Sequence, residues 1–271
     1  MDRFLIALDL DGTLLTDEKE ITNTTKDYFT ELRQLGHKIV LVTGRPFRGC
    51  VNYYEELNLD TPLICNNGNV IDNMGDDSFP NLRNFIDKSD ADEIFKFIKD
   101  DLIMAFYNVD DNFYSYNTKG VHFDYYHIEE DTTIIDRDLD HPNNEAPILM
   151  MYFVPLSAKE KFENFMKKFP HLSLRVWGVE EGVVLYEIHS DNANKGSSLL
   201  KVAQHLKIKR ENIISFGDGA NDFELIDSAG HGVAMINGIE ELKKTTKHHT
   251  AHTNNNDGVL NYLKEFLKKN A

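Results

Sequence analysis

The chain has 271 residues, of which 41% are hydrophobic and 27% charged, as is usual for a globular protein with a sizeable core. Its formal charge of -16 argues against nucleic acid and anionic membranes as partners, because both bind basic surfaces. Two cysteines are too few for a disulfide framework. The sequence has no long apolar stretch and no signal-peptide pattern, so we expect a cytoplasmic protein with no membrane partner.

The first 70 residues alternate strand and helix patterns. The apolar run FLIALDL at 4–10 predicts a strand that is buried on both faces. Thr22 is placed to cap a helix that ends near Gly36. The segments that follow predict a strand, a helix and a third strand, at 38–44, 46–57 and 62–68. This order predicts a right-handed parallel sheet.

Between residues 82 and 190 the pattern changes to short segments of period two that are rich in aromatic residues, which predict antiparallel hairpins. A helix followed by two strands is expected twice, starting at 90–101 and at 157–169. The polar stretch 127–146 reads as loop around at most a short helix. We therefore expect an inserted α+β domain at 82–190, between the core segments 1–81 and 191–271.

After residue 190 the alternation of helix and strand returns. The expected elements are helix, strand, helix, strand and two closing helices, at 195–206, 212–219, 221–229, 231–238, 238–246 and 256–269. Asn256 or Asp257 is expected to cap the last helix. The fold class predicted is α/β, a Rossmann-like doubly wound parallel sheet with an inserted α+β cap domain.

Four predicted strands end in polar clusters, with the sequences DLDGT, VTGR, CNNG and SFGDGAND. Because ligands of doubly wound sheets bind at the carboxyl ends of the strands, we expect these clusters to converge. Convergence would bring together the carboxylates of Asp9, Asp11, Asp218 and Asp222. Such a group requires a cation, and an all-oxygen site suits Mg²⁺.

The other polar residues of these clusters favour an anion. Thr43 offers a hydroxyl, Gly44 an unobstructed backbone N–H, and Lys195 a positive charge at a helix N-terminus. A carboxylate can attack phosphorus while a neighbouring acid protonates the leaving group and then activates water. Asp9 and Asp11 fit these two roles, so the residues predict phosphoryl transfer.

DLDGTLL, VTGR, the lysine of ANKGSSL and GDGANDFELI resemble, in order, the four motifs of the haloacid dehalogenase (HAD) superfamily phosphatases. The segment between the second and third motifs looks like the type IIB (C2B) cap of the Cof-like branch. The resemblance spans essentially the whole chain. It implies Asp9 as nucleophile and Asp11 as general acid and base.

The same resemblance implies the ligands of the metal and of the phosphate. Mg²⁺ would be held by Asp9, the Asp11 backbone carbonyl and Asp218, with Asp222 as a support or occasional ligand. The phosphate would be held by the Leu10 N–H and by Thr43, Gly44, Lys195 and Asn221.

Three features of the sequence have alternative interpretations. Arg45 could bind substrate, bridge to an acid or cap the next helix. The histidines of KHHTAH at 247–252 lack convincing metal partners and favour a partly exposed short strand. Aromatic residues of the inserted domain could stack on a substrate ring but more often fill a core, namely Tyr114, Tyr116, Phe123, Tyr125 and Tyr126.

The expected function is a Mg²⁺-dependent phosphatase for small phosphorylated metabolites, with sugar phosphates as the first class, acting through an aspartyl phosphate. We expect a monomer or weak homodimer. A phosphosugar mutase is the alternative enzyme, but it needs clustered arginines in the cap, which offers only Arg83, Arg137 and Arg175. A non-catalytic phosphometabolite sensor is the other alternative, although such proteins usually lose a nucleophile or an acid.

Overall fold

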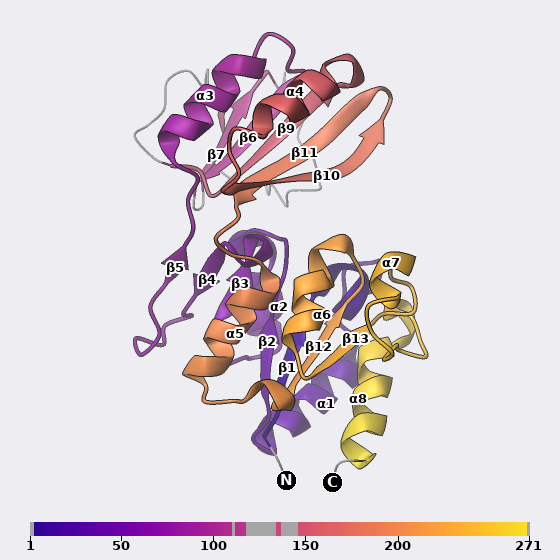
Figure 1. The fold of residues 1–271 in the computed structure, drawn as a ribbon. Coiled ribbons are helices and arrows are strands. Elements are labelled where there is room, and N and C mark those ends of the chain that lie inside the picture. The colour runs from indigo at the N-terminus through magenta and orange to yellow at the C-terminus, as the bar shows by residue number, and fades with distance from the viewer. Residues whose placement is uncertain (1–2, 110–111, 118–133, 137–145, 270–271) are drawn as a thin grey trace. The chain divides into compact units, whose positions relative to one another are not determined.

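A computed structural model of the chain describes residues 3–109, 112–117, 134–136 and 146–269 (Figure 1). The chain divides into two compact units. One combines Met1–Leu82 with Ala193–Ala271, and the other is Arg83–Asn192. The insertion expected from the sequence, 82–190, differs from the second unit by one residue at its start and two at its end.

The first unit is built on a parallel sheet of four hydrogen-bonded strands in the order β13-β12-β1-β2. Their bounds are Leu5–Leu8 for β1, Lys38–Leu41 for β2, Ile213–Gly217 for β12 and His231–Ala234 for β13. β1 lies in the middle, and nearly every residue of these strands is buried, as their continuous apolar runs predict. Strands from the N-terminal segment (β1 and β2) and from the C-terminal segment (β12 and β13) therefore share one sheet.

The third strand predicted from the sequence, β3 (Leu63–Cys65), is attached to this sheet through a parallel bridge between Val42 and Ile64. β3 also pairs antiparallel with β4 (Val70–Asp72), in a three-stranded sheet that β5 (Leu82–Arg83) completes. The turn between β3 and β4 is consequently held next to the carboxyl end of β2.

Helices pack against both faces of the parallel sheet (Figure 1). Among its described residues, the α-helices of this unit are α1 (Asn23–Gln34), α2 (Val51–Glu56), α5 (Lys195–His205), α6 (Phe223–Ser228), α7 (Glu240–Lys243) and α8 (Gly258–Lys269). Leu199 of α5 and Leu225 of α6 share a core with Leu5 of β1. On the opposite face, Tyr262 of α8 packs edge-on against Phe216 of β12. This layering confirms the predicted α/β fold class.

Two residues were predicted to cap helices, and their side chains have different partners in the structure. The Thr22 side chain accepts a hydrogen bond from the Thr25 N–H at 3.2 Å, which confirms it as the cap of α1. Asp257 precedes α8, but its carboxylate accepts hydrogen bonds from the hydroxyls of Thr22 and Thr25 at 2.6 and 3.0 Å. The side chain expected to cap the last helix therefore ties it to the start of α1.

The second unit contains a six-stranded sheet in the order β10-β11-β9-β6-β7-β8. Its strands are Met104–Val109 (β6), Asn112–Tyr116 (β7), Ile134–Asp136 (β8), Leu149–Pro155 (β9), Leu172–Glu180 (β10) and Val183–Ser190 (β11). α3 (Lys88–Ile98) and α4 (Lys159–Met166) share a core with one face of this sheet. Each helix is followed in the chain by a pair of antiparallel strands, β6–β7 and β10–β11, as the internal repeat predicts.

The interpretation of 127–146 as loop or short helix was wrong at one point. β8 lies inside this stretch and pairs parallel to β7, with Ile134 opposite Phe113. The stretch is polar as a whole, so the two adjacent β-branched residues Ile134 and Ile135 were not recognised as a strand. They form most of the three-residue β8. Residues 127–133 and 137–145, like Phe123, Tyr125 and Tyr126, fall outside the described residues. None of the helices that the structure describes has the length and apolarity that crossing a bilayer would require.

Candidate active site

The two acids of DLDGT lie just beyond the end of β1 and have different surroundings. Asp9 is in extended conformation and only 5% exposed, whereas the Asp11 side chain is 42% exposed. Residues 10–14 form one irregular turn, with Gly12 in the left-handed region at φ 71°. Leu10, between the acids, has a fully buried side chain. The turn therefore separates two carboxylates that are only two residues apart.

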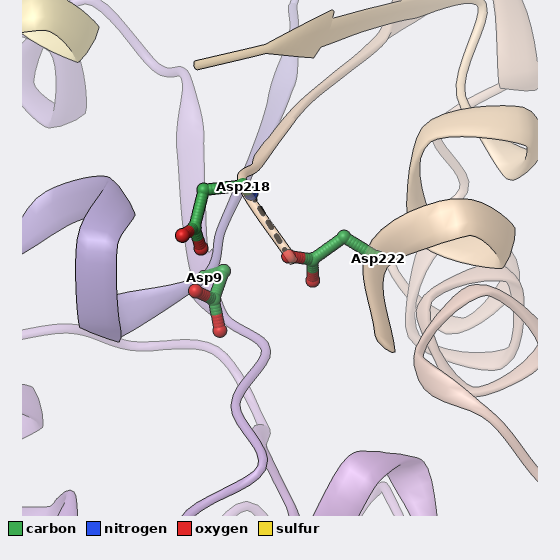
Figure 2. A group of neighbouring side chains, drawn as sticks. All are labelled: Asp9, Asp218 and Asp222. Carbon is green, nitrogen blue, oxygen red and sulfur yellow. Dashed lines mark hydrogen bonds between the residues drawn. The ribbon is translucent and has the colours of Figure 1, made fainter. Parts of the chain in front are cut away.

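Asp9 lies in a cluster with Asp218 and Asp222, and carboxylate oxygens of the three fall within 4.8 Å of one another (Figure 2). Burial raises the pKa of Asp9, and the charges of its two neighbours add to this effect although Lys195 opposes it. Burial, followed by the charge of Asp222, raises the pKa of Asp218 to about 6. Three hard oxygen donors that destabilise one another as anions fit a divalent cation such as Mg²⁺. The Asp11 carboxylate is not part of this cluster.

Lys195 is the cation that this cluster already contains. It is fully buried, and its Nζ lies 2.6 Å from Asp9 Oδ1 and 2.7 Å from Asp222 Oδ1. Burial alone would lower the pKa of Lys195, but the charges of the two carboxylates outweigh it and raise the pKa. As the first residue of α5, Lys195 is fixed by the Asn194 cap, whose side chain accepts the Ser197 N–H at 2.8 Å. The lysine is thus charged and held beside Asp9.

Asp222 supports the loop that presents Asp218. Its Oδ2 accepts hydrogen bonds from the backbone N–H groups of Asp218 and Gly219, both at 3.0 Å, and Figure 2 shows the first of these. Its other oxygen accepts from Lys195. A fully buried carboxylate with three donors is well satisfied. Asp222 therefore links the Lys195 side chain to the backbone of the loop that carries Asp218.

Arg45 bridges to an acid, which was one of its three alternatives. Its Nε and Nη2 each donate to the Asp11 carboxylate at 2.6 Å, and Lys19 Nζ donates to the same group at 2.7 Å. Burial would raise the pKa of Asp11, but the hydrogen bonds from Arg45 and Lys19 outweigh it and lower the pKa. Arg45 is 6% exposed and also donates to the Gly49 carbonyl at 3.0 Å. Asp11 is therefore held ionised in this arrangement.

Two of the loops expected to hold phosphate, the one with Thr43 and Gly44 and the one with Asn221, are in contact. Thr43 is buried and its hydroxyl accepts the Arg45 N–H at 3.1 Å. A Cβ added to Gly44 would lie 3.3 Å from Asn221 Nδ2, so these two residues are in close contact although they are far apart in the sequence. Asn221 Nδ2 donates to Asn67 Oδ1 at 2.9 Å. Asn67 was not predicted as a site residue, although CNNG was recognised as a polar strand end.

The remaining candidates make contacts of other kinds. His248 packs against His231, with ring centroids 3.9 Å apart, and His249 makes an isolated bridge with Ala234. In the second unit Tyr114 belongs to the buried core, and Arg175 Nη1 lies 3.6 Å from Glu187. Arg137 falls outside the residues described. Within the described chain, none of these features adds to the acidic cluster.

The close approach of Gly12 to Asp218 gives a direct test of the cluster. A Cβ at Gly12 would lie 2.3 Å from Asp218 Oδ2, and the backbone there is left-handed. We expect Gly12→Ala to displace the Asp218 carboxylate and lower kcat/KM by about 10–100-fold, the range found when groups that support a polar site are disturbed. Steady-state kinetics on folded protein measures this loss.

Gly36→Ala is the matched control, because Gly36 has φ 92° but no atom within 4 Å of the added Cβ. It should lower the melting temperature through backbone strain while leaving kcat/KM near the wild-type value. Wild-type kcat/KM in Gly12→Ala would contradict the assigned position of Asp218.

A sequence model of the haloacid dehalogenase-like hydrolases matches residues 6–263. The chain belongs to this family. It is 31% identical over 280 residues to the 5-amino-6-(5-phospho-D-ribitylamino)uracil phosphatase of Bacillus subtilis, with 97% of each chain covered. It is 26% identical to the pyridoxal phosphate phosphatase of Escherichia coli, with 88% of this chain and 90% of the relative covered.

Solved structures of the family share the fold. A haloacid dehalogenase-like hydrolase from Bacteroides thetaiotaomicron matches with a TM-score of 0.80 at 24% identity, covering 98% of this chain and all of that one. A HAD subclass IIB sugar phosphatase also matches at 0.80, with 21% identity and 97% and 98% coverage. The recognition of a Cof-like HAD phosphatase from the sequence is confirmed. Phosphatases of this superfamily generally use a divalent metal, and the Asp9 cluster supplies a suitable acidic group.

Proposed function

We propose that this HAD phosphatase hydrolyses small phosphorylated metabolites, with sugar phosphates as the expected class, through an aspartyl phosphate on Asp9 and with Mg²⁺. The observation that carries the proposal is the position of Asp9, which is buried in a cluster with the buried Asp222, the half-buried Asp218 and the charged Lys195. The names of the relatives from Bacillus subtilis and Escherichia coli, both phosphatases of small phosphorylated compounds, support the substrate class.

Asp9, Asp218 and the Asp11 backbone carbonyl would hold Mg²⁺, with Asp222 as support or occasional ligand. The raised pKa of Asp9 and of Asp218 supports a cation at this point, because both are destabilised as anions without one. When bound, the metal supplies positive charge that offsets the repulsion between the phosphate and Asp9.

The phosphate would be held on its other side by donors of the protein. Lys195 contributes a charge that the two carboxylates keep in place. Gly44 and Asn221 are already in close contact, so their donors can reach one anion. The full proposed set is the Leu10 N–H, Thr43, Gly44, Lys195 and Asn221.

In the first half of the reaction, an oxygen of Asp9 attacks phosphorus and forms the aspartyl phosphate. The bond to the ester oxygen breaks, its electron pair stays on that oxygen, and Asp11 gives it a proton. In the second half, Asp11 takes a proton from water, whose oxygen attacks phosphorus. The bond from phosphorus to the Asp9 oxygen breaks, its electron pair restores the Asp9 carboxylate, and inorganic phosphate leaves. Because Asp11 must first carry a proton, its bonds to Arg45 and Lys19 have to open during turnover.

A panel of phosphate esters tests the proposed function. Sugar phosphates, pyridoxal phosphate and p-nitrophenyl phosphate are incubated with the enzyme after treatment with EDTA, with and without added Mg²⁺, and the released phosphate is measured. We expect hydrolysis only when Mg²⁺ is restored. If folded protein hydrolyses none of them, or is equally fast in EDTA, the proposed function is wrong.

Asp218→Asn tests the metal site separately. We expect it to raise the Mg²⁺ concentration needed for half-maximal rate by about 10–100-fold, because a charged oxygen donor is lost. Asp227→Asn on the exposed side of α6 is the control and should keep the wild-type requirement. An unchanged Mg²⁺ dependence in Asp218→Asn would remove Asp218 from the proposed ligands.

A further inference from the structure

The turn after β3 contains three successive residues in the left-handed region. Asn66 has φ 49°, Asn67 54° and Gly68 94°, and all three are buried. This conformation is uncommon for residues other than glycine, and it persists where surrounding contacts determine it. Three successive residues in the left-handed region, next to the loops of the candidate active site, indicate that the position of this turn is needed for function.

Asn67 joins two of the sequence motifs. Its N–H donates to the Thr43 carbonyl at 3.0 Å, and its side-chain Oδ1 accepts from Asn221 Nδ2 at 2.9 Å. Asn67 itself is 2% exposed. One buried residue therefore connects the loop of Thr43 and Gly44 with the loop that carries Asn221.

The pair formed by Asn67 and Asn221 packs directly against Gly44. A Cβ on Gly44 would lie 3.0 Å from Asn67 Oδ1 and 3.3 Å from Asn221 Nδ2. A carboxamide nitrogen has two hydrogens in a fixed plane, so the hydrogen bond to Asn67 sets the direction of the second one. The hydrogen bond from Asn221 Nδ2 to Asn67 Oδ1 therefore fixes the orientation of the Asn221 carboxamide relative to the Gly44 backbone.

We propose that Asn67 is a positioning residue of this active site, which orients the Asn221 carboxamide for the phosphate without touching the substrate. The inference rests on the proposed function, in which Asn221 and Gly44 hold phosphate. Without the Asn67 side chain, Asn221 would rotate among several orientations, and part of its contribution to phosphate binding would be lost.

The test is a double-mutant cycle with p-nitrophenyl phosphate as substrate and inorganic phosphate as inhibitor. Asn67→Gly tolerates the left-handed backbone and removes the whole side chain, including the carboxamide that accepts from Asn221. We expect it to lower kcat/KM and weaken phosphate inhibition, each by about 10-fold, as removal of one oriented contact does. Because Asn67 acts through Asn221, the double variant with Asn221→Ala should be no slower than Asn221→Ala alone.

Asn66→Gly is the matched control, since Asn66 has nearly the same backbone angle but no bond to Asn221 among its described contacts. It should retain wild-type kinetics. Asn67→Ser, whose side chain is too short to reach Asn221, should behave like Asn67→Gly and replaces it if glycine impairs folding. Fully additive losses in the double variant, or wild-type kinetics in Asn67→Gly, would overturn the inference. An inactive wild-type enzyme would instead contradict the proposed function.

Discussion

Asp9→Asn is expected to lower kcat by about 10⁴-fold or more, the size of effect seen when a nucleophile is removed. Asp9 sits at the end of β1, buried beside Lys195, and a carboxamide there cannot form the aspartyl phosphate. The variant should stay folded, because neutralising one of three carboxylates that repel one another costs little. Steady-state kinetics, together with a melting temperature at or above that of the wild type, measures both parts of this prediction.

Asp11→Asn is the informative comparison, because its carboxylate lies outside the acidic cluster and is bound by Arg45 and Lys19. With a substrate whose leaving group needs no proton, this variant should still give a burst of product in one turnover. It should then be slow, because no base activates water for the second step. Identical behaviour of the Asp9 and Asp11 variants in this burst experiment would contradict the division of roles.

Replacing Lys195 with Met is expected to cost both stability and activity. Lys195 is fully buried, and its Nζ lies 2.6 and 2.7 Å from Asp9 and Asp222. Removing one partner of a buried ionic group leaves uncompensated charge, which typically lowers the free energy of unfolding by about 3–5 kcal/mol. Urea unfolding measures this change. Activity should be lost even in protein that remains folded, because the phosphate loses its buried cation.

Lys201→Met is the control, since Lys201 lies on the same helix but is exposed. It changes the same residue type and should shift the free energy of unfolding by less than about 0.5 kcal/mol. If Lys195→Met were as stable as this control, the charges that the structure places around Lys195 would not be present in the folded protein.

The meeting of distant motifs could be predicted from the sequence because the parallel strands of a doubly wound sheet present their carboxyl ends at the same edge. Leu8 lies opposite Phe216 in neighbouring parallel strands, so Asp9 and Asp218 leave the sheet side by side. The proximity of Asp9 to Asp218 follows from this geometry, and the position of Lys195 at the start of α5 follows from the helix pattern of its segment. The family was also recognisable, since its four motifs occur in order in the sequence, each at the end of a predicted strand or at the start of a predicted helix.

Contacts that depend on a few side-chain torsions could not be predicted. Arg45 had three plausible partners, and its pairing with Asp11 requires the exact position of a loop 34 residues away. Asn67 belongs to a sequence that looks like any turn, and its left-handed backbone is visible only in the structure. Asn256 or Asp257 was expected to cap α8, yet the hydroxyls of Thr22 and Thr25, at the start of α1, donate to the Asp257 carboxylate.

The most direct test of the account is chemical trapping of the phosphorylated enzyme. Wild-type protein is mixed with Mg²⁺ and a fast substrate, quenched in acid during turnover and reduced with borohydride, which converts an acyl phosphate of aspartate to homoserine. Peptide mass spectrometry should then find homoserine at position 9, dependent on substrate and absent from Asp9→Asn. Turnover without any modification at Asp9, or modification at another carboxylate, would contradict the assignment of Asp9 as the nucleophile.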